Sequence, residues 1–378
     1  MKKHVLALAL AATLPLAAHA DIKVGVITAA TGPGASLGIP YKNTFSLLPK
    51  TLGGEPVEYI IVDDATDTTI STKLARRLIE QDKVDLIIGS SNVPTAIAVG
   101  EVANELKVPQ IALSPTPLTP EKSPWTFSVP QPMDVMSIPV VRHMKKQGIK
   151  TVGYLGFSDS WGDLVLSGFK SQIGDSGIKI VASERYARPD TSVAGQVLKL
   201  ISAKPDAVLL GGSGTPAALP QVTLRERNYK GPIYHNPAVI NKDFLRVGGK
   251  YVEGAYATTG PVMVAEQLPD SNPIKKVALD FIHKYEGKFG DNTRNAFSAY
   301  SWDAYLIADQ AVAKAAKTAK PGTPAFRSAL RDAIESGKEV IGVHGVYNMS
   351  KTDHTGVDER SAVLVQVQNG QWKLVQDK

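Results

Sequence analysis

Residues 22–38 read IKVGVITAATGPGASLG, a short apolar run followed by a glycine-rich turn, and residues 36–50 then show helical spacing. The same order recurs with VEYIIVDD (57–64), VDLIIGSS (84–91) and VPQIALS (108–114). Helical patterns at 68–81 and after Pro94 separate these runs. Such alternation is typical of a parallel sheet with helices on both faces, because its strands are buried on both sides.

The alternation stops at residues 114–132, where closely spaced prolines predict irregular chain, since proline can neither donate to a sheet ladder nor continue a helix. It then restarts, with strands predicted at 150–157, 178–183, 205–212 and 231–236 and helices at 134–147, 163–173, 192–202 and 216–227. Three helices are predicted at 274–289, 294–316 and 326–336, and a hairpin around Asn369-Gly370. Two sheets of similar size predict two lobes, and 378 residues exceed what one core usually organises.

The first twenty residues have the pattern of a secretory signal peptide. Lys2 and Lys3 precede an apolar stretch, and AHA (18–20) provides small residues for cleavage. A membrane anchor needs about 20 apolar residues, whereas Thr13 and Pro15 interrupt this stretch. The chain contains no cysteine, so disulfides, thiolate metal sites and a lipid-anchored cysteine are excluded. We therefore expect a mature protein that is free in the periplasm.

The charge distribution argues against nucleic acid as a partner. The 42 basic and 36 acidic residues give a net charge of +6, and the two signs are interspersed rather than gathered in a stripe. Such a small excess favours anionic ligands only weakly.

Polar segments follow six predicted strands, at 31–38, 89–95, 114–119, 157–163, 211–216 and 235–239. Ligands of open parallel sheets bind outside the carboxyl ends of the strands. Because three segments belong to each half, we expect a cleft lined from both lobes. The candidate ligand-binding residues are Ala35, Ser36, Ser91, Asn92, Ser114, Thr116, Trp161, Ser213, Thr215 and Asn236. A serine or threonine before a helix can equally be an N-cap, and Trp161 can be ordinary packing, so these alternatives stay open.

Enzymatic motifs do not fit. The turn at 31–38 lacks the lysine of a phosphate loop, and Gly32, Gly34 and Gly38 lack dinucleotide spacing. Ser213 has no glycine two residues after it, as a nucleophile elbow requires. Asp63, Asp64 and Asp67 suggest helix capping more than a metal site. No catalytic residue, cofactor or metal is predicted.

The segments KVGVITAATGPGASLG (23–38), YIIVDDATDTTISTKLARRLIEQDKVDLIIGSSN (59–92), VPQIALSPTP (108–117) and VLLGGSGTPAALPQ (208–221) resemble the periplasmic branched-chain amino acid binding proteins of ABC importers. The resemblance implies an α/β fold of two Rossmann-like lobes joined by three crossovers, near Pro130, Val262 and Gly345. Residues 21–130 with 263–345 would form lobe 1, and residues 131–262 with 346–378 would form lobe 2. It also implies a monomer that closes on its ligand and delivers it to a membrane permease.

In that family, serine and threonine hydroxyls and backbone amides of the first lobe hold the ligand carboxylate. The matching stretches are 90–92 and 114–116, and hydrogen bonds to a charged group, worth about 1.5–3 kcal/mol each, would suffice without a lysine or arginine. Amino-acid binders also offer an acidic residue on the second lobe for the ammonium, but 211–216 and 235–239 contain none. A buried unpaired ammonium is costly.

We therefore expect a small hydrophobic or aromatic carboxylate, including 2-oxo acids, with Trp161 as a stacking face. The segment GSGTPAALPQ (212–221) also resembles the corresponding segment of family members that bind such acids. If Asp243 or Glu253 reached the cleft, a branched-chain or other hydrophobic amino acid would remain a candidate. A sensor linked to a chemoreceptor is a second alternative, and an exported enzyme is disfavoured by the missing catalytic groups.

Overall fold

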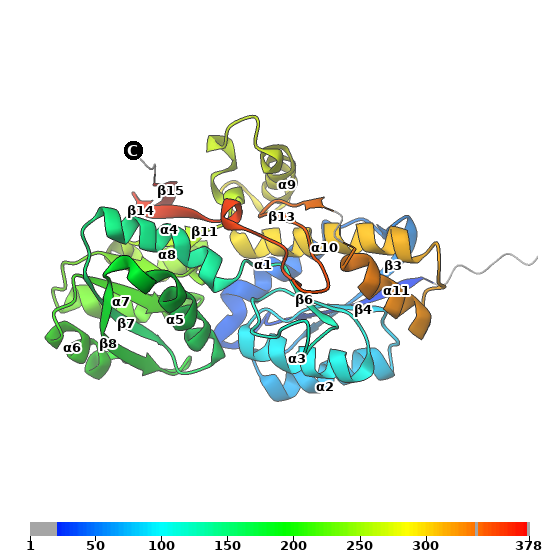
Figure 1. Cartoon of the computed structure of the whole chain (residues 1–378), viewed down its shortest axis with the longest axis horizontal. Helices are drawn as coiled ribbons and strands as arrows, with labels where there is room; N and C mark the ends of the chain where they lie inside the picture. Colours follow the sequence, from blue (N-terminus) through cyan, green and yellow to red (C-terminus); the bar gives the residue numbers. More distant parts are fainter. Residues whose placement is uncertain (1–20, 337–338, 376–378) are drawn as a thin grey trace, which may run out of the picture.

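The chain forms two lobes lying side by side, each built on its own sheet (Figure 1). The computed structural model describes residues 21–336 and 339–375. The predicted signal peptide, residues 1–20, lies outside them. The α/β architecture of two lobes is therefore confirmed.

The first sheet has the strand order β2-β3-β1-β4-β5-β6. Its strands are β1 (Ile22–Thr28), β2 (Thr51–Leu52), β3 (Glu55–Asp63), β4 (Leu86–Gly89), β5 (Gln110–Ala112) and β6 (Thr126–Ser128). All neighbours are parallel except β2, which pairs antiparallel with β3. Strands β1 and β4 are almost wholly buried, as expected for a sheet covered on both faces.

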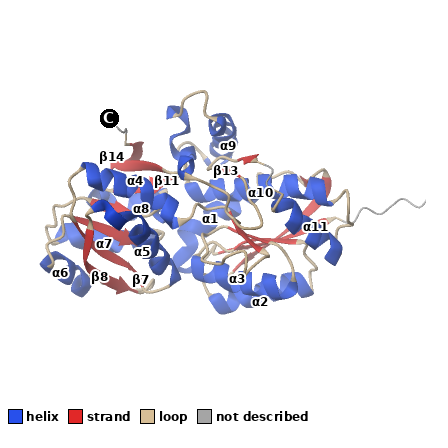
Figure 2. Cartoon of the chain, viewed as in Figure 1, coloured by secondary structure: helices blue, strands red, loops and turns tan. Residues whose placement is uncertain are grey.

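Helices cover both faces of this sheet (Figure 2). The helices of this lobe are α1 (Ala35–Phe45), α2 (Thr68–Glu80), α3 (Val93–Leu106), α9 (Pro273–Phe289), α10 (Ala296–Ala315) and α11 (Pro324–Ile334). Of these, α9 packs on α10 through Phe281 and Trp302 rather than on the sheet. Helices α2 and α3 pack over one face through Leu78, Ile79 and Val102, while α10 packs on α1 on the other side of the sheet. The three helices predicted after Pro273 are thus present, and they complete the first lobe.

The second sheet has the order β15-β14-β11-β10-β9-β7-β8. Its strands are β7 (Thr151–Phe157), β8 (Lys179–Tyr186), β9 (Ala207–Gly211), β10 (Ile233–His235), β11 (Tyr256–Thr259), β14 (Val363–Gln368) and β15 (Gln371–Leu374). Its helices are α4 (Met133–Lys146), α5 (Ser160–Ile173), α6 (Ala194–Ser202), α7 (Ala218–Glu226) and α8 (Lys242–Gly248). The predicted C-terminal hairpin is confirmed: Asn369 and Gly370 both have positive φ at its turn.

The chain passes between the lobes three times: between β6 and α4, after β11, and between the short strand β13 (Val346–Tyr347) and β14. Strand β13 pairs with β12 (Val340–Ile341) beside α10. A hinge of three connections was predicted, but the third follows β13 rather than lying near Gly345, because β13 still pairs with β12 of the first lobe. In the part of the chain that the structure describes, no helix is long and apolar enough to cross a membrane.

The prediction of irregular chain from 114 to 132 is wrong in one respect. Residues Thr126 to Ser128 form β6 and pair with β5. Pro124 and Pro130 flank this strand without belonging to it, and β6 is at the edge of the sheet, where neighbouring prolines are tolerated.

Candidate functional site

A cavity lies between the lobes, at the carboxyl ends of both sheets. It encloses about 420 Å³ of space not filled by protein atoms, part of it open to solvent. The first lobe contributes Leu37, Tyr41, Ser91, Asn92, Val93, Leu113, Ser114, Pro115, Phe297 and Tyr300, and the first connection between the lobes contributes Pro130 and Gln131. The second lobe contributes Trp161, Arg188, Ser213, Pro237 and Ala238. We call this space the interlobe cavity.

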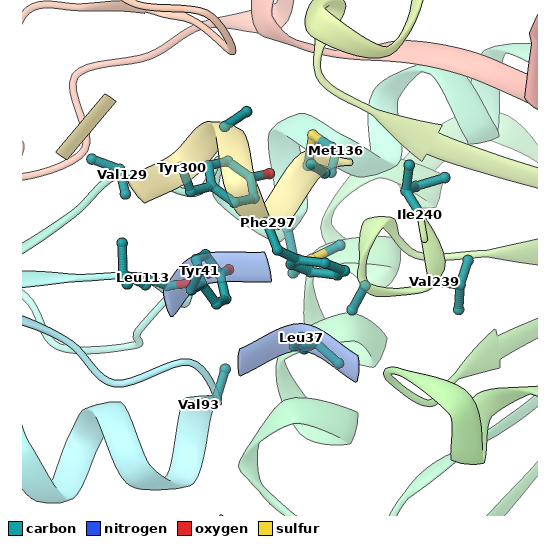
Figure 3. Packing of buried hydrophobic residues seen from close by; sticks show 14 of the residues in the cluster. Leu37, Tyr41, Val93, Leu113, Val129, Met136, Val239, Ile240, Phe297 and Tyr300 are labelled. Atoms are coloured by element: carbon teal, nitrogen blue, oxygen red, sulfur yellow. Dashed lines mark hydrogen bonds between the residues drawn. The ribbon is translucent and has the colours of Figure 1, made fainter. Parts of the chain in front are cut away.

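The aromatic part of the first-lobe wall comes from α1 and α10 (Figure 3). Tyr41 and Phe297 pack edge to face, with ring centroids 5.6 Å apart, and the Tyr41 hydroxyl donates to the carbonyl of Leu113 at 2.6 Å. Leu37 lies one turn before Tyr41 on the same helix, so it faces the cavity from the same side. This wall provides a rigid apolar surface for the body of a ligand.

Tyr300 ties this wall to the hinge. Its hydroxyl donates to Oε1 of Gln131 at 2.6 Å. The Gln131 amide in turn donates to the carbonyls of His344 at 3.1 Å and Ser361 at 2.9 Å. Gln131 belongs to the first connection between the lobes, and Ser361 to the third. A side chain that lines the cavity is therefore linked directly to two of the three crossovers.

The loop between β4 and α3 is held from behind by a buried acid. The Ser90 hydroxyl donates to Asp64, and the Ser71 hydroxyl donates to the same carboxylate oxygen at 2.9 Å. Burial raises the pKa of Asp64, partly offset by these hydrogen bonds. The next residue, Ser91, accepts from the Ala29 amide at 3.0 Å through its Oγ. Ser91 and Asn92 are thereby fixed at the cavity wall.

Arg188 follows β8 and is the only charged side chain among the described residues that line the interlobe cavity. Its Nε donates to Oδ2 of Asp159 at 2.6 Å, and the two side chains are only 13% and 25% exposed. Its Nη1 donates to the Ser213 hydroxyl at 2.9 Å. The guanidinium carbon also lies 4.4 Å from the centroid of the Phe157 ring. The guanidinium is therefore held on one edge and one face.

Asp159 has a second role as the N-cap of α5. Its Oδ1 accepts from the amides of Trp161 at 3.0 Å and Gly162 at 3.3 Å. The positive end of the helix dipole therefore shares the charge of this carboxylate with Arg188. The indole of Trp161 donates to the Gly212 carbonyl at 3.1 Å, so this side chain stands in a fixed orientation at the wall.

Two hydrogen bonds cross between the lobes beside the cavity. The Thr215 amide donates to the Ser36 hydroxyl at 3.2 Å, and Nη1 of Arg188 donates to Oδ1 of Asn92 at 3.4 Å. The amide nitrogen of Asn92 has no partner, although this side chain is buried. The second contact is long for a charge-assisted hydrogen bond, which is usually 2.7–2.9 Å.

Five of the ten predicted residues line the interlobe cavity: Ser91, Asn92, Ser114, Trp161 and Ser213. Ser36 and Thr215 join the two lobes through the hydrogen bond just described, and Ala35 is the first residue of α1, next to Ser36.

The other two predicted residues have different surroundings. Asn236 holds the ends of β9 and β10 together, because its amide donates to the carbonyls of Leu210 at 3.1 Å and Gly212 at 2.7 Å. Thr116 lines a separate surface hollow with Thr126, Ser128 and His354.

Sequence reasoning missed Arg188 and the aromatic residues of α1 and α10. Strand β8 continues to Tyr186, three residues beyond the predicted end at residue 183, so Arg188 follows a strand end that the sequence pattern does not mark. An arginine just beyond a strand, before Pro189-Asp190, was the available signal. Tyr41, Phe297 and Tyr300 lie on helices, where apolar side chains cannot be told from ordinary core residues by their spacing.

The acidic residues considered from the sequence have structural partners away from the cavity. Asp67 caps α2 by accepting from the Ile70 amide, and Asp63 accepts from the Thr31 hydroxyl at 2.7 Å. Asp243 pairs with Arg246, and Glu253 accepts from the amides at the turn of the C-terminal hairpin. Within residues 21–336 and 339–375, no group of three potential metal ligands was found.

The chain matches the family described as periplasmic binding protein over residues 21–371. An extracellular ligand-binding receptor from Rhodopseudomonas palustris HaA2 is 48% identical, with a TM-score of 0.92 covering 94% of this chain and 100% of that one. Leu/Ile/Val-binding protein homolog 7 from Brucella abortus (strain 2308) is 26% identical, covering 99% of this chain and 96% of that protein.

A third similarity is to the solute-binding protein of an ABC transporter from R. palustris in complex with benzoate. It is 21% identical, with a TM-score of 0.80 covering 94% of this chain and 96% of that one. At this identity the similarity shows the fold. The chain belongs to the periplasmic binding protein family and is a binding protein rather than an enzyme.

Proposed function

We propose that this protein binds a small hydrophobic or aromatic carboxylate, including 2-oxo acids, in the interlobe cavity and delivers it to the membrane permease of an ABC importer. It acts as a monomer, exported by the signal peptide at residues 1–20 and free in the periplasm. Closure of the two lobes around the acid forms the surface that the permease recognises.

The observation that carries this proposal is the composition of the cavity wall. Tyr41, Trp161, Phe297 and Tyr300 offer aromatic surface, Arg188 offers a positive charge, and none of the described lining residues is aspartate or glutamate. An apolar wall with a single cation suits a ligand that has an apolar body and one negative charge.

An amino acid fits this wall poorly, because its ammonium needs acceptors. Asp159, the carboxylate paired with the cavity-lining Arg188, already accepts from Arg188 and from two helix amides. The side-chain carbonyl of Gln131 accepts from Tyr300, and that of Asn92 accepts from Arg188. A buried ammonium without partners costs several kcal/mol, more than the aromatic contacts return at about 0.5–1.5 kcal/mol per pair beyond area burial.

Relatives of the same fold do not decide the ligand. The Brucella relative is named for leucine, isoleucine and valine, and the R. palustris neighbour was solved with benzoate. The choice between an amino acid and an organic acid therefore rests on the side chains of this chain's own cavity.

A thermal-shift panel on the mature chain, residues 21–378, tests the proposal. A ligand at one hundred times its dissociation constant adds about 2.7 kcal/mol to the free energy of unfolding. We expect clear increases in melting temperature with benzoate, phenylacetate or phenylpyruvate and none with leucine or valine. The reverse pattern would reject the ligand class, and chemical conversion of a bound compound would reject a purely binding role.

A further inference from the structure

We infer that the ligand carboxylate sits on the guanidinium of Arg188 in the second lobe and bridges to the Asn92 amide of the first lobe, rather than resting mainly on Ser91 and Ser114. This inference rests on the proposed function and adds to it the binding position of the carboxylate and the orientation of the ligand. The apolar body then points toward Tyr41, Phe297 and Tyr300 of the first lobe.

The surroundings of Arg188 fit a prepared anion site. Asp159 fixes the Nε edge, and Phe157 lies against one face of the guanidinium. Along the Nη1 edge, the acceptors are a neutral hydroxyl at 2.9 Å and a neutral amide oxygen at 3.4 Å. A carboxylate is a stronger acceptor than either group, and its two oxygens match the fork of a guanidinium.

Asn92 supplies the second observation. It precedes α3 without capping it through its side chain, and its amide nitrogen is buried with no acceptor. A buried donor without a partner is unfavourable. A ligand oxygen between Asn92 and Arg188 gives this donor an acceptor and replaces the long contact between the two side chains.

The first-lobe loop between β4 and α3 is a less favourable binding position for a negative charge than Arg188. Asp64 lies directly behind it, joined to the Ser90 hydroxyl, and Ser91 comes next in the chain. A second carboxylate at Ser91 is placed near the first, and like charges in a buried site disfavour each other. In the second lobe, Asp159 is instead paired with Arg188 itself and with the N-terminus of α5.

This arrangement makes the acid part of the closing contact. Arg188 and Asn92 belong to different lobes and touch only at 3.4 Å. A carboxylate between them joins the lobes by two sets of hydrogen bonds. Arg188 is thus a specificity-determining residue, and Asp159 is a positioning residue that acts through Arg188.

The test compares acids with their neutral amides by isothermal titration calorimetry: benzoate against benzamide and phenylacetate against phenylacetamide. The proteins are wild type, Arg188→Gln, Arg188→Lys, Asp159→Asn and Ser114→Ala. Arg246→Gln is the matched control, because it removes the same charge from an exposed pair outside the cavity.

Arg188→Gln is expected to weaken acid binding by about 10- to 100-fold, the range for a hydrogen bond to a charged group, with little change for the amides. Arg188→Lys keeps the positive charge but lacks the two parallel donors of a guanidinium, so it is expected to lose less acid affinity than Arg188→Gln. Asp159→Asn lowers the ratio of acid to amide affinity, which a purely structural defect would not do. Arg246→Gln keeps wild-type affinities.

Any of three results would overturn the inference. If Ser114→Ala removes acid binding while Arg188→Gln keeps the acid preference, the first-lobe loops hold the carboxylate and the proposed function survives. If the wild-type protein binds none of the acids, both the inference and the proposed function fail. If Arg188→Gln folds poorly, the test uses the ratio of acid to amide affinity in Arg188→Lys and Asp159→Asn. Wild-type ratios in both variants would also contradict the inference.

Discussion

At the scale of single residues, the turn at 31–38 shows how far the sequence could be interpreted. Its glycines ruled out a nucleotide site by their spacing, but their purpose was not visible. A Cβ at Gly34 would lie 2.7 Å from the amide nitrogen of Asn92, and one at Gly38 would lie 2.0 Å from the Ala29 carbonyl. These two positions therefore have no room for a side chain, because neighbouring atoms pack against the backbone of the turn. Leu37 and Tyr41, on the helix that follows, line the cavity.

His235 leads to a prediction about pH. Its Nε2 lies 2.5 Å from Oε1 of Gln221, whose amide donates to the Tyr251 carbonyl, so the imidazole is the donor, and its Nδ1 is buried without a partner. Burial lowers the pKa of His235 to about 3. The folded protein therefore keeps this ring neutral while the unfolded chain takes up a proton below about pH 6.5. This contribution to stability is complete above that pH and is lost as the pH falls toward 3.

Urea unfolding of the wild type and His235→Gln at pH 7 and pH 5 measures this contribution. The wild type is expected to lose about 2 kcal/mol more than the variant between these pH values, since each pKa unit corresponds to about 1.4 kcal/mol. His344 and Asp303 also have shifted pKa values, and they are common to both proteins, so the difference isolates His235. An equal loss in both proteins would show that His235 is not held neutral.

At the scale of elements, the helices and the longer strands were predictable because apolar periodicity marks them, and α2 begins at the predicted residue. What the periodicity could not fix was where short strands begin and end. Strand β11 has four residues, and its pairing with β10 and β14 is a tertiary contact that local pattern does not report. The same limit hid β6 and the last residues of β8, and with them Arg188.

The segment between β9 and α7 gives a prediction about closure. Gly214 has φ +62°, and a Cβ there would lie 2.6 Å from Cδ1 of Leu37 and 2.7 Å from Oγ of Ser36 in the opposite lobe. Gly214→Val is therefore expected to hold the lobes apart and to weaken acid binding by about 10- to 100-fold, since overpacking costs roughly 1–3 kcal/mol.

Gly249→Val is the matched control. Gly249 has φ +51° and ψ −136°, close to the φ +62° and ψ −155° of Gly214, so valine carries comparable backbone strain there, but nothing lies within 4 Å of its Cβ. Small-angle scattering at saturating acid should give a larger radius of gyration for Gly214→Val than for Gly249→Val. Equal dimensions and equal affinities in the two variants would mean that the contact between Gly214 and the first lobe does not limit closure.

At the scale of the whole molecule, two lobes and a ligand site between them followed from the order of strands and helices, because parallel strands place their carboxyl ends at one edge. The boundaries, 21–130 with 263–345 and 131–262 with 346–378, stay a prediction, as do the ligand-binding roles of the ten candidate residues. The link from Tyr300 through Gln131 to two crossovers was not predictable. It joins residues 131, 300, 344 and 361, whose proximity only the folded chain creates.

The most direct test of organic-acid binding is a calorimetric comparison of phenylpyruvate with L-phenylalanine, and of 4-methyl-2-oxopentanoate with L-leucine, on the mature protein. Within each pair only the 2-oxo and ammonium groups differ. At least one 2-oxo acid is expected to bind about 100-fold or more tightly than its amino acid, because no described residue lining the cavity carries a carboxylate to pair with an ammonium. Tighter binding of the amino acid in both pairs would contradict a cavity built for organic acids.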